Sequence, residues 1–213
     1  MNLLAQAFFY VRQRPHDFAA ALAAHLRLSL CALGVALVMA LPLGLACARS
    51  ERLARVLTPL LGVSRAVPSL AVLALVLPFT GAGFRPALIA LALLGVPSIL
   101  INTQAGFRQV SPSAIEAAQG MGLNPLEVLR NVEWPLALPS VLAGVRLATV
   151  EIIAGASLAA FIGGGGLGSY IVNGLTMYDF RLLLVGALPV AILALGGDGF
   201  WAFFEHRRAR SWR

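Results

Sequence analysis

The sequence predicts an all-α fold, a polytopic transmembrane helical bundle with about five spans. Two observations carry this prediction: 59% of the 213 residues are hydrophobic with a mean hydropathy of +0.85, and only 12% are charged. Soluble domains contain about 25% charged residues, so this chain lacks the polar surface that water requires. At about 20 residues per span, its length holds five or six spans and no nucleotide-binding or soluble receptor domain. We therefore expect residues 1–213 to form a single transmembrane domain.

The net charge of +7 comes entirely from arginine, because the chain contains no lysine. In a soluble protein such a balance would indicate a nucleic acid partner. Here the arginines are concentrated in loops and in the tail, as the positive-inside rule describes for membrane proteins. We therefore expect membrane lipid around the chain and no nucleic acid partner.

Five apolar segments are long enough to cross a membrane. The expected spans are 24–48, a segment that begins at the membrane surface within 51–65 and continues from 68 to 78, then 86–106, 136–162 and 181–204. Proline and glycine at Pro59, Gly62 and Pro68 predict a short or kinked second span. Residues 1–20 interleave apolar and charged residues, which is typical of an amphipathic surface helix.

Arginine placement predicts the orientation. With the polar segment 113–135 and the tail inside, nine arginines lie on the cytoplasmic side and four outside. The inner set is Arg49, Arg52, Arg55, Arg108, Arg130, Arg207, Arg208, Arg210 and Arg213, and the outer set is Arg12, Arg14, Arg85 and Arg181. This asymmetry predicts an external N-terminus and a cytoplasmic C-terminus.

The polar segment 113–135 carries two helix-start signals. Ser113 is followed three residues later by Glu116, the spacing of a capping box, and Gly122 supplies the backbone freedom on which a helix ends. A second start follows, with Asn124 suited to the N-cap and Pro125 to the first helical position. The pattern predicts two short helices joined at a glycine corner.

This segment resembles the EAA loop of ABC importer permeases. That family's pattern is Glu-Ala-Ala, three residues, Gly, nine residues, Ile, any residue, Leu, Pro. Here the matching residues are Glu116, Ala117, Ala118, Gly122, Val132 and Pro135, and Trp134 stands where the family has leucine. The resemblance implies a coupling helix that docks into a groove on a cytoplasmic ATPase subunit. The residues that it places at this contact are Glu116, Ala117, Ala118, Gly122, Asn124 and Pro125.

Two further stretches resemble the osmoprotectant branch of these permeases. Residues 157–168 read SLAAFIGGGGLG, where the branch carries TLAAFIGAGGLG, and residues 67–71 read VPSLA, where it carries IPSLA. The resemblance covers about residues 25–205. It implies a methionine-permease-like fold and a pathway for a small solute such as glycine betaine, choline or carnitine.

The same resemblance implies the partners and the compartment. Two permease subunits, identical or paired with a paralogue, would form the pathway in the bacterial inner membrane, with ATPase subunits below and a periplasmic solute-binding protein above. ATP and Mg²⁺ would bind the ATPase, so we expect no cofactor, metal site or catalytic residue in this chain; it has no Walker loop and no lysine. Two alternatives stay open: a permease for amino acids or another small nutrient, and a membrane scaffold that transports nothing.

Four ionisable side chains fall in or near the spans. A charge at the bilayer centre costs at least about 2.5 kcal/mol, so each needs a reason. Arg65, Arg146 and Asp198 are expected to snorkel toward the cytoplasmic surface. Glu151 lies deeper and is expected to face the bundle interior or a wet pathway, or to pair with another helix. The candidate pathway residues are Ser69, Glu151, Ser157, Phe161, Gly163 and Gly165.

Overall fold

A computed structural model describes residues 2–210 of the chain, and these residues form helices and their connections without any strand. The elements in chain order are α1 (Leu3–Gln13), α2 (Pro15–Arg49), α3 (Glu51–Ser64), α4 (Ser69–Thr80), α5 (Phe84–Arg108), α6 (Pro112–Gly120), α7 (Pro125–Val128), a π-helical turn (Leu129–Glu133), α8 (Trp134–Leu158), a 3₁₀ turn (Ala159–Ile162), α9 (Gly168–Thr176) and α10 (Phe180–Arg210). The predicted all-α class is confirmed.

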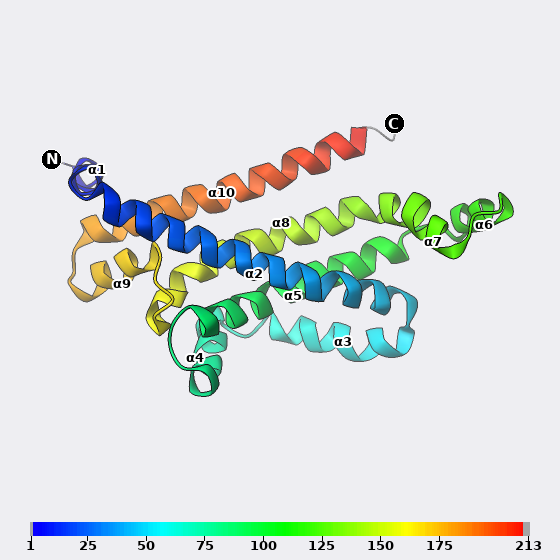
Figure 1. Cartoon of the computed structure of the whole chain (residues 1–213), viewed down its shortest axis with the longest axis horizontal. Coiled ribbons are helices and arrows are strands. Elements are labelled where there is room, and N and C mark those ends of the chain that lie inside the picture. Colours follow the sequence, from blue (N-terminus) through cyan, green and yellow to red (C-terminus); the bar gives the residue numbers. More distant parts are fainter. Residues whose placement is uncertain (1, 211–213) are drawn as a thin grey trace.

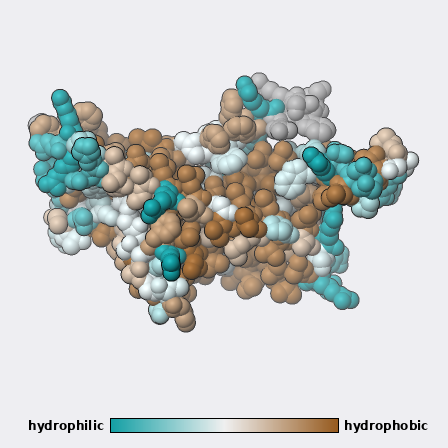
Figure 2. Space-filling view, in the orientation of Figure 1, coloured by the Kyte–Doolittle hydropathy of each residue, from teal (hydrophilic) through white to brown (hydrophobic). Residues whose placement is uncertain are grey.

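The long helices α2, α5, α8 and α10 run along the long axis of an elongated bundle (Figure 1). One end of the bundle carries α6, α7, the α2–α3 connection and the C-terminal end of α10, whereas α1 and α9 lie at the opposite end. Hydrophobic residues cover the middle of the visible face and hydrophilic residues gather toward the two ends (Figure 2). This banding is the surface that a bilayer requires.

The core is built where α5 packs between α2 and α8. Of the most apolar stretch of α5, 61% is buried, against 17% for α10. Small residues let the backbones approach closely, as is common between membrane helices. A Cβ on Gly144 of α8 would lie only 2.8 Å from the Ser98 carbonyl oxygen of α5. The close α5–α8 contact therefore depends on glycine at this position.

The prediction of about five spans is confirmed. Among the described residues, four helices are long and apolar enough to cross a membrane, and the pair α3–α4 makes a fifth if it forms one span. The axes of α3 and α4 differ by 104° across a break of four residues. The α3–α4 pair is therefore broken near Pro68, where the sequence predicted a short or kinked span.

Three local predictions are wrong. Helix α6 is capped by Ser111 and not by Ser113, because Ser111 precedes Pro112 and its hydroxyl accepts from the Ala114 backbone N–H. The second expected short helix does not stay separate: from Pro125 the chain continues without a break into the fourth span. The first span begins earlier than expected, since α2 starts at Pro15.

Two further points concern the ends of the last span. Helix α9, between the glycine run and α10, was not predicted. At the C-terminus, Arg213 of the predicted inner set lies outside the described residues, and only the backbone is described for Arg208 and Arg210.

Candidate functional site

The first candidate site is the exposed corner that joins α6 to α7. Asn124 caps α7 as predicted: its side-chain oxygen accepts from the backbone N–H groups of Leu126 and Glu127, both at 3.0 Å. The Glu127 carboxylate in turn accepts from the Asn124 backbone N–H at 2.8 Å, which completes a capping box. Gly122 sits between the helices with φ of +88°, a conformation that favours glycine.

The outer surface of this corner is apolar at its tip. Met121 and Leu126, on either side of Gly122 in the chain, are 75% and 71% exposed. Glu116 and Ala117 are also exposed, and so are Asn124 and Pro125. Ala118 is 2% exposed, so it packs inside the corner and is not part of the surface that a partner can reach.

The corner is tied to the bundle by polar contacts with α2. Arg49, the last residue of α2, bonds both carboxylate oxygens of Glu133 at 3.1 and 3.2 Å. From α5, the Arg108 guanidinium donates to the Cys47 carbonyl oxygen at 3.2 Å. These contacts join the ends of α2 and α5 to each other and to the start of α8.

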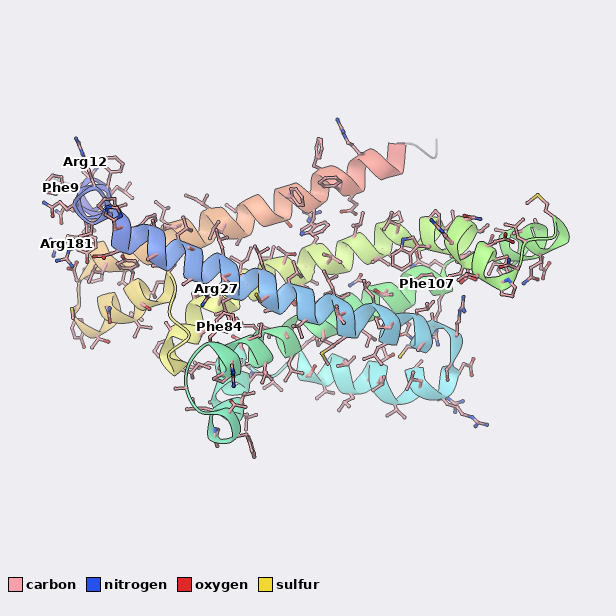
Figure 3. All side chains as sticks on the ribbon, in the orientation of Figure 1. Phe9, Arg12, Arg27, Phe84, Phe107 and Arg181 are labelled. Carbon is pink, nitrogen blue, oxygen red and sulfur yellow. The ribbon has the colours of Figure 1, made fainter. Side chains whose placement is uncertain are left out.

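Trp134, which stands where the family pattern has leucine, packs against an aromatic residue of α5. Its ring packs against Phe107 near the end of α5, with centroids 5.7 Å apart and planes at 47° (Figure 3). A large aromatic residue at this position therefore fills the contact between α5 and the start of α8.

The second candidate site is a pocket of about 680 Å³ at the break between α3 and α4, closed by α5 and α8. Its volume falls in the range of about 300–1,000 Å³ that is usual for small-molecule sites. Ser69 at the start of α4 and Glu151 of α8 both line it, along with Arg65 from the break itself. Apolar side chains, among them Val72 and Leu94, form much of the remaining wall.

Glu151 pairs with other helices, as one of the sequence alternatives held. Its Oε2 accepts from the Ser98 hydroxyl of α5 at 2.7 Å, and its Oε1 lies 3.7 Å from the Arg65 guanidinium. Arg65 follows the last residue of α3, so the whole length of α3 separates it from the α2–α3 connection. Sequence reasoning missed both partners, since Ser98 lies 53 residues from Glu151 and carries no local signal.

The other expected pathway residues do not line this pocket. Ser157 donates its hydroxyl to the Ala154 carbonyl oxygen within its own helix. Phe161, in the 3₁₀ turn, is 52% exposed. Gly163 lies beside Gly83 of the α4–α5 connection, and a Cβ on Gly165 would meet nothing within 4 Å. The structure therefore joins two of the six residues, Ser69 and Glu151, in one pocket.

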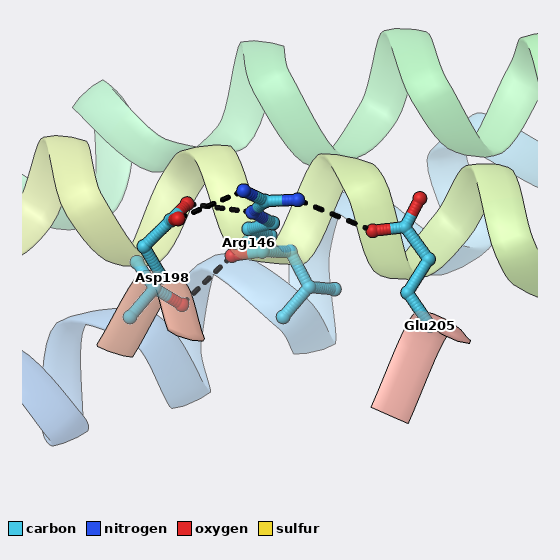
Figure 4. Close-up of polar contacts among 5 residues, drawn as sticks. Arg146, Asp198 and Glu205 are labelled. Carbon is cyan, nitrogen blue, oxygen red and sulfur yellow. Dashed lines mark hydrogen bonds and ion pairs between the residues drawn. The ribbon is translucent and has the colours of Figure 1, made fainter. Parts of the chain in front are cut away.

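Arg146 and Asp198 bond each other, a pairing that the sequence did not predict. The Arg146 guanidinium donates to both Asp198 oxygens at 2.6 and 2.8 Å, and to Glu205 at 3.4 Å (Figure 4). The bidentate geometry is the strong form of an arginine–carboxylate contact. It ties α8 to α10, which has few buried contacts of its own.

The elongated bundle, with four or five helical segments apolar enough to cross a bilayer within the described residues, is that of an integral membrane protein. The family described as "Binding-protein-dependent transport system inner membrane component" matches residues 40–210. The chain belongs to this family, and the relatives described next are transport permeases.

Characterised permeases are similar over most of their length. The choline transport system permease protein OpuBB of Bacillus subtilis (strain 168) is 40% identical over 86% of this chain and 84% of its own. The carnitine transport permease protein OpuCB of Listeria monocytogenes is 44% identical over 80% and 78%.

Solved structures share the fold. The inward-facing MetNI methionine ABC transporter has a TM-score of 0.81 at 18% identity, over 90% of this chain and 95% of that one. An amino acid ABC transporter crystallised with histidines has a TM-score of 0.74 at 21% identity, over 97% and 99%. The methionine-permease-like architecture implied by the sequence is therefore confirmed.

Proposed function

We propose that this chain forms, with a second permease subunit, the membrane pathway of an ATP-driven importer for a small quaternary amine such as glycine betaine, choline or carnitine. The observation that carries the solute class is the similarity to choline and carnitine permeases at 40% and 44% identity over most of both chains. The methionine and amino acid transporters are similar at 18–21% identity, which supports the fold alone.

Coupling to ATP hydrolysis takes place at the α6–α7 corner. Exposed Met121 and Leu126 give an ATPase subunit an apolar surface to bind, and Gly122 leaves the backbone between them open to close approach. Because α7 is continuous with α8, a displacement of the corner moves the fourth span. The Arg49–Glu133 contact passes the same displacement to α2.

Selection of the solute rests mainly on a periplasmic binding protein. A quaternary ammonium keeps its charge at every pH and is best recognised by aromatic faces. In the sequence only Phe161 and Tyr170 stand near the glycine run. In the structure the Tyr170 ring packs against Tyr10 of α1 and Phe18 of α2, while Phe161 is 52% exposed, so the two do not form an aromatic cage. A pathway needs weak contacts, because a tight site would trap the solute, as in ion channels.

Uptake by the reconstituted transporter tests the proposal. The chain, its permease and ATPase partners and its solute-binding protein are placed in proteoliposomes and supplied with ATP. We expect accumulation of radiolabelled betaine, choline or carnitine but not of methionine. A Gly122→Trp variant should insert normally yet lose uptake. Tryptophan is strained at the φ of +88° that Gly122 adopts, and its side chain would cover the docking surface.

Two results would contradict this function. Uptake of methionine without any quaternary amine would overturn the solute class and leave an importer permease. Full uptake by Gly122→Trp would show that the ATPase subunit does not bind the α6–α7 corner.

A further inference from the structure

We infer that the pocket between α3, α4, α5 and α8 is a transient solute site that favours zwitterions, with Arg65 meeting the carboxylate and Glu151 the quaternary ammonium. This inference rests on the proposed function and deepens it, because it assigns residues of the pathway and a preference among quaternary amines. The same pocket holds Ser69, at the start of α4.

Arg65 has unused binding capacity. A guanidinium carries five N–H donors, yet within the described part of the chain the only polar contact of Arg65 is the 3.7 Å approach to Glu151. Its side chain is 42% exposed and faces the pocket. By contrast, Arg146 is held by two carboxylates at 2.6–3.4 Å. Of these two arginines, Arg65 is the one that can receive a carboxylate from outside the chain.

Glu151 is held in place by one carboxylate oxygen, and its other oxygen remains open to the pocket. Ser98, itself fully buried, donates to one carboxylate oxygen at 2.7 Å and fixes the side chain against α5. The other oxygen faces Arg65 at a distance well beyond the 2.7–2.9 Å of a charge-assisted hydrogen bond. This oxygen therefore stays available to a cation that enters the pocket.

The charge balance of the pocket favours a neutral solute. Arg65 and Glu151 together are neutral, so a zwitterion that places its carboxylate on one and its ammonium on the other leaves every charge paired. A simple cation such as choline pairs Glu151 but leaves Arg65 without a partner. Apolar wall residues such as Val72 and Leu94 suit the methyl groups of a quaternary amine.

The location agrees with a pathway role. The pocket opens at a broken helix within the spans, and substrate sites of many transporters are formed by discontinuous transmembrane helices. A loose ion pair also meets the need for weak contacts. The charges of the solute replace the contact between Arg65 and Glu151, and that contact re-forms when the solute leaves.

The test compares betaine with choline in two variants of the reconstituted transporter. Arg65→Gln makes the pocket net negative, so the betaine-to-choline ratio of uptake (kcat/KM) should fall about tenfold or more, the scale of a lost charge-assisted contact. Glu151→Gln removes the partner of the ammonium, so uptake of both solutes should fall. If Arg65→Gln does not assemble, Arg65→Lys keeps the charge without the fork, and the ratio should fall by a smaller factor.

Arg27→Gln is the matched control. Arg27 is an exposed arginine of α2 that lies over the Phe84 ring at 4.9 Å (Figure 3), and neither residue lines the pocket. Its replacement should leave the ratio unchanged. ATPase activity and size-exclusion elution confirm that each complex is assembled.

The outcomes separate the two proposals. An equal fall for betaine and choline in Arg65→Gln, or no change in either pocket variant, would show a structural ion pair and overturn the zwitterion site alone. A wild-type transporter that carries none of betaine, choline and carnitine would overturn the proposed solute class, and the site with it.

Discussion

Individual charged residues within the spans differ in how completely their charges are balanced. Arg146 is saturated by Asp198 and Glu205, and it joins α8 to α10 at a point where α10 has few buried contacts. Arg65 and Glu151 form a loose pair that faces a pocket. Because charges are costly within a bilayer, the saturated group is best explained by packing and the unsaturated pair by contact with a solute.

The Arg146 group gives a prediction about stability. Asp198→Asn keeps the shape of the side chain but removes the charge that accepts two bonds at 2.6 and 2.8 Å. We expect the thermal unfolding midpoint in detergent to fall by several degrees. The matched control is Glu205→Gln, whose contact is longer at 3.4 Å and whose loss should matter less. Equal midpoints for the two variants would show that the bidentate contact does not hold α10.

The sequence identified the residues of these contacts but not their pairing. Hydropathy alone reveals an ionisable residue within an apolar span, so all four were found. Asp198 lies 52 residues from its partner Arg146, and Ser98 lies 53 residues from its partner Glu151, in each case on another helix. Such pairings depend on how the helices rotate and cross, and local sequence carries no signal for this. The ion pairs were therefore not predicted.

Among the elements, the glycine run between the 3₁₀ turn and α9 serves close packing and not simple flexibility. Gly166 has φ of +78°, and a Cβ there would lie 3.1 Å from the His25 Cα of α2. At Gly168 a Cβ would collide with the Ser157 carbonyl oxygen. The run thus fits α9 against the ends of α2 and α8.

Two alanine variants separate backbone strain from packing. Gly165 and Gly166 both have positive φ, at +71° and +78°, so alanine strains both about equally. Only Gly166→Ala also pushes against the backbone of α2. Overpacking of this kind costs about 1–3 kcal/mol, so the free energy of unfolding should fall further for Gly166→Ala than for Gly165→Ala. Equal losses in an SDS unfolding titration would contradict the packing role.

Helix ends were predictable where the signal is local. Asn124 and Pro125 start α7 as predicted, and Glu127 completes a capping box from residues close in the chain. At α6 two serines compete, and Pro112 decides between them: it holds the preceding Ser111 in the extended conformation that an N-cap needs. The continuity of α7 with α8 depends on packing along the whole span. Capping residues do not predict it, because they mark only where a helix starts or ends.

For the whole molecule, the number of spans and the bundle class followed from hydropathy, because the bilayer imposes a minimum length on each span. The 104° break between α3 and α4 leaves the topology dependent on one question. If the pair crosses the membrane, five spans place the termini on opposite sides. If it re-enters, four spans place them on the same side.

Reporter fusions answer this question. With five spans, a reporter inserted at Tyr178, an 86% exposed residue between α9 and α10, should be external, and one fused after Arg213 cytoplasmic. A reporter at Ala82, between α4 and α5, should also be external, because α3–α4 would have crossed. The arginine asymmetry favours this outcome. So does the position of α1 at the end of the bundle opposite the C-terminal end of α10, because an even number of spans would return the chain to the end where it began. A cytoplasmic reporter at Ala82 would make α3–α4 a re-entrant loop, and the pocket at its break would then open toward one side of the membrane only.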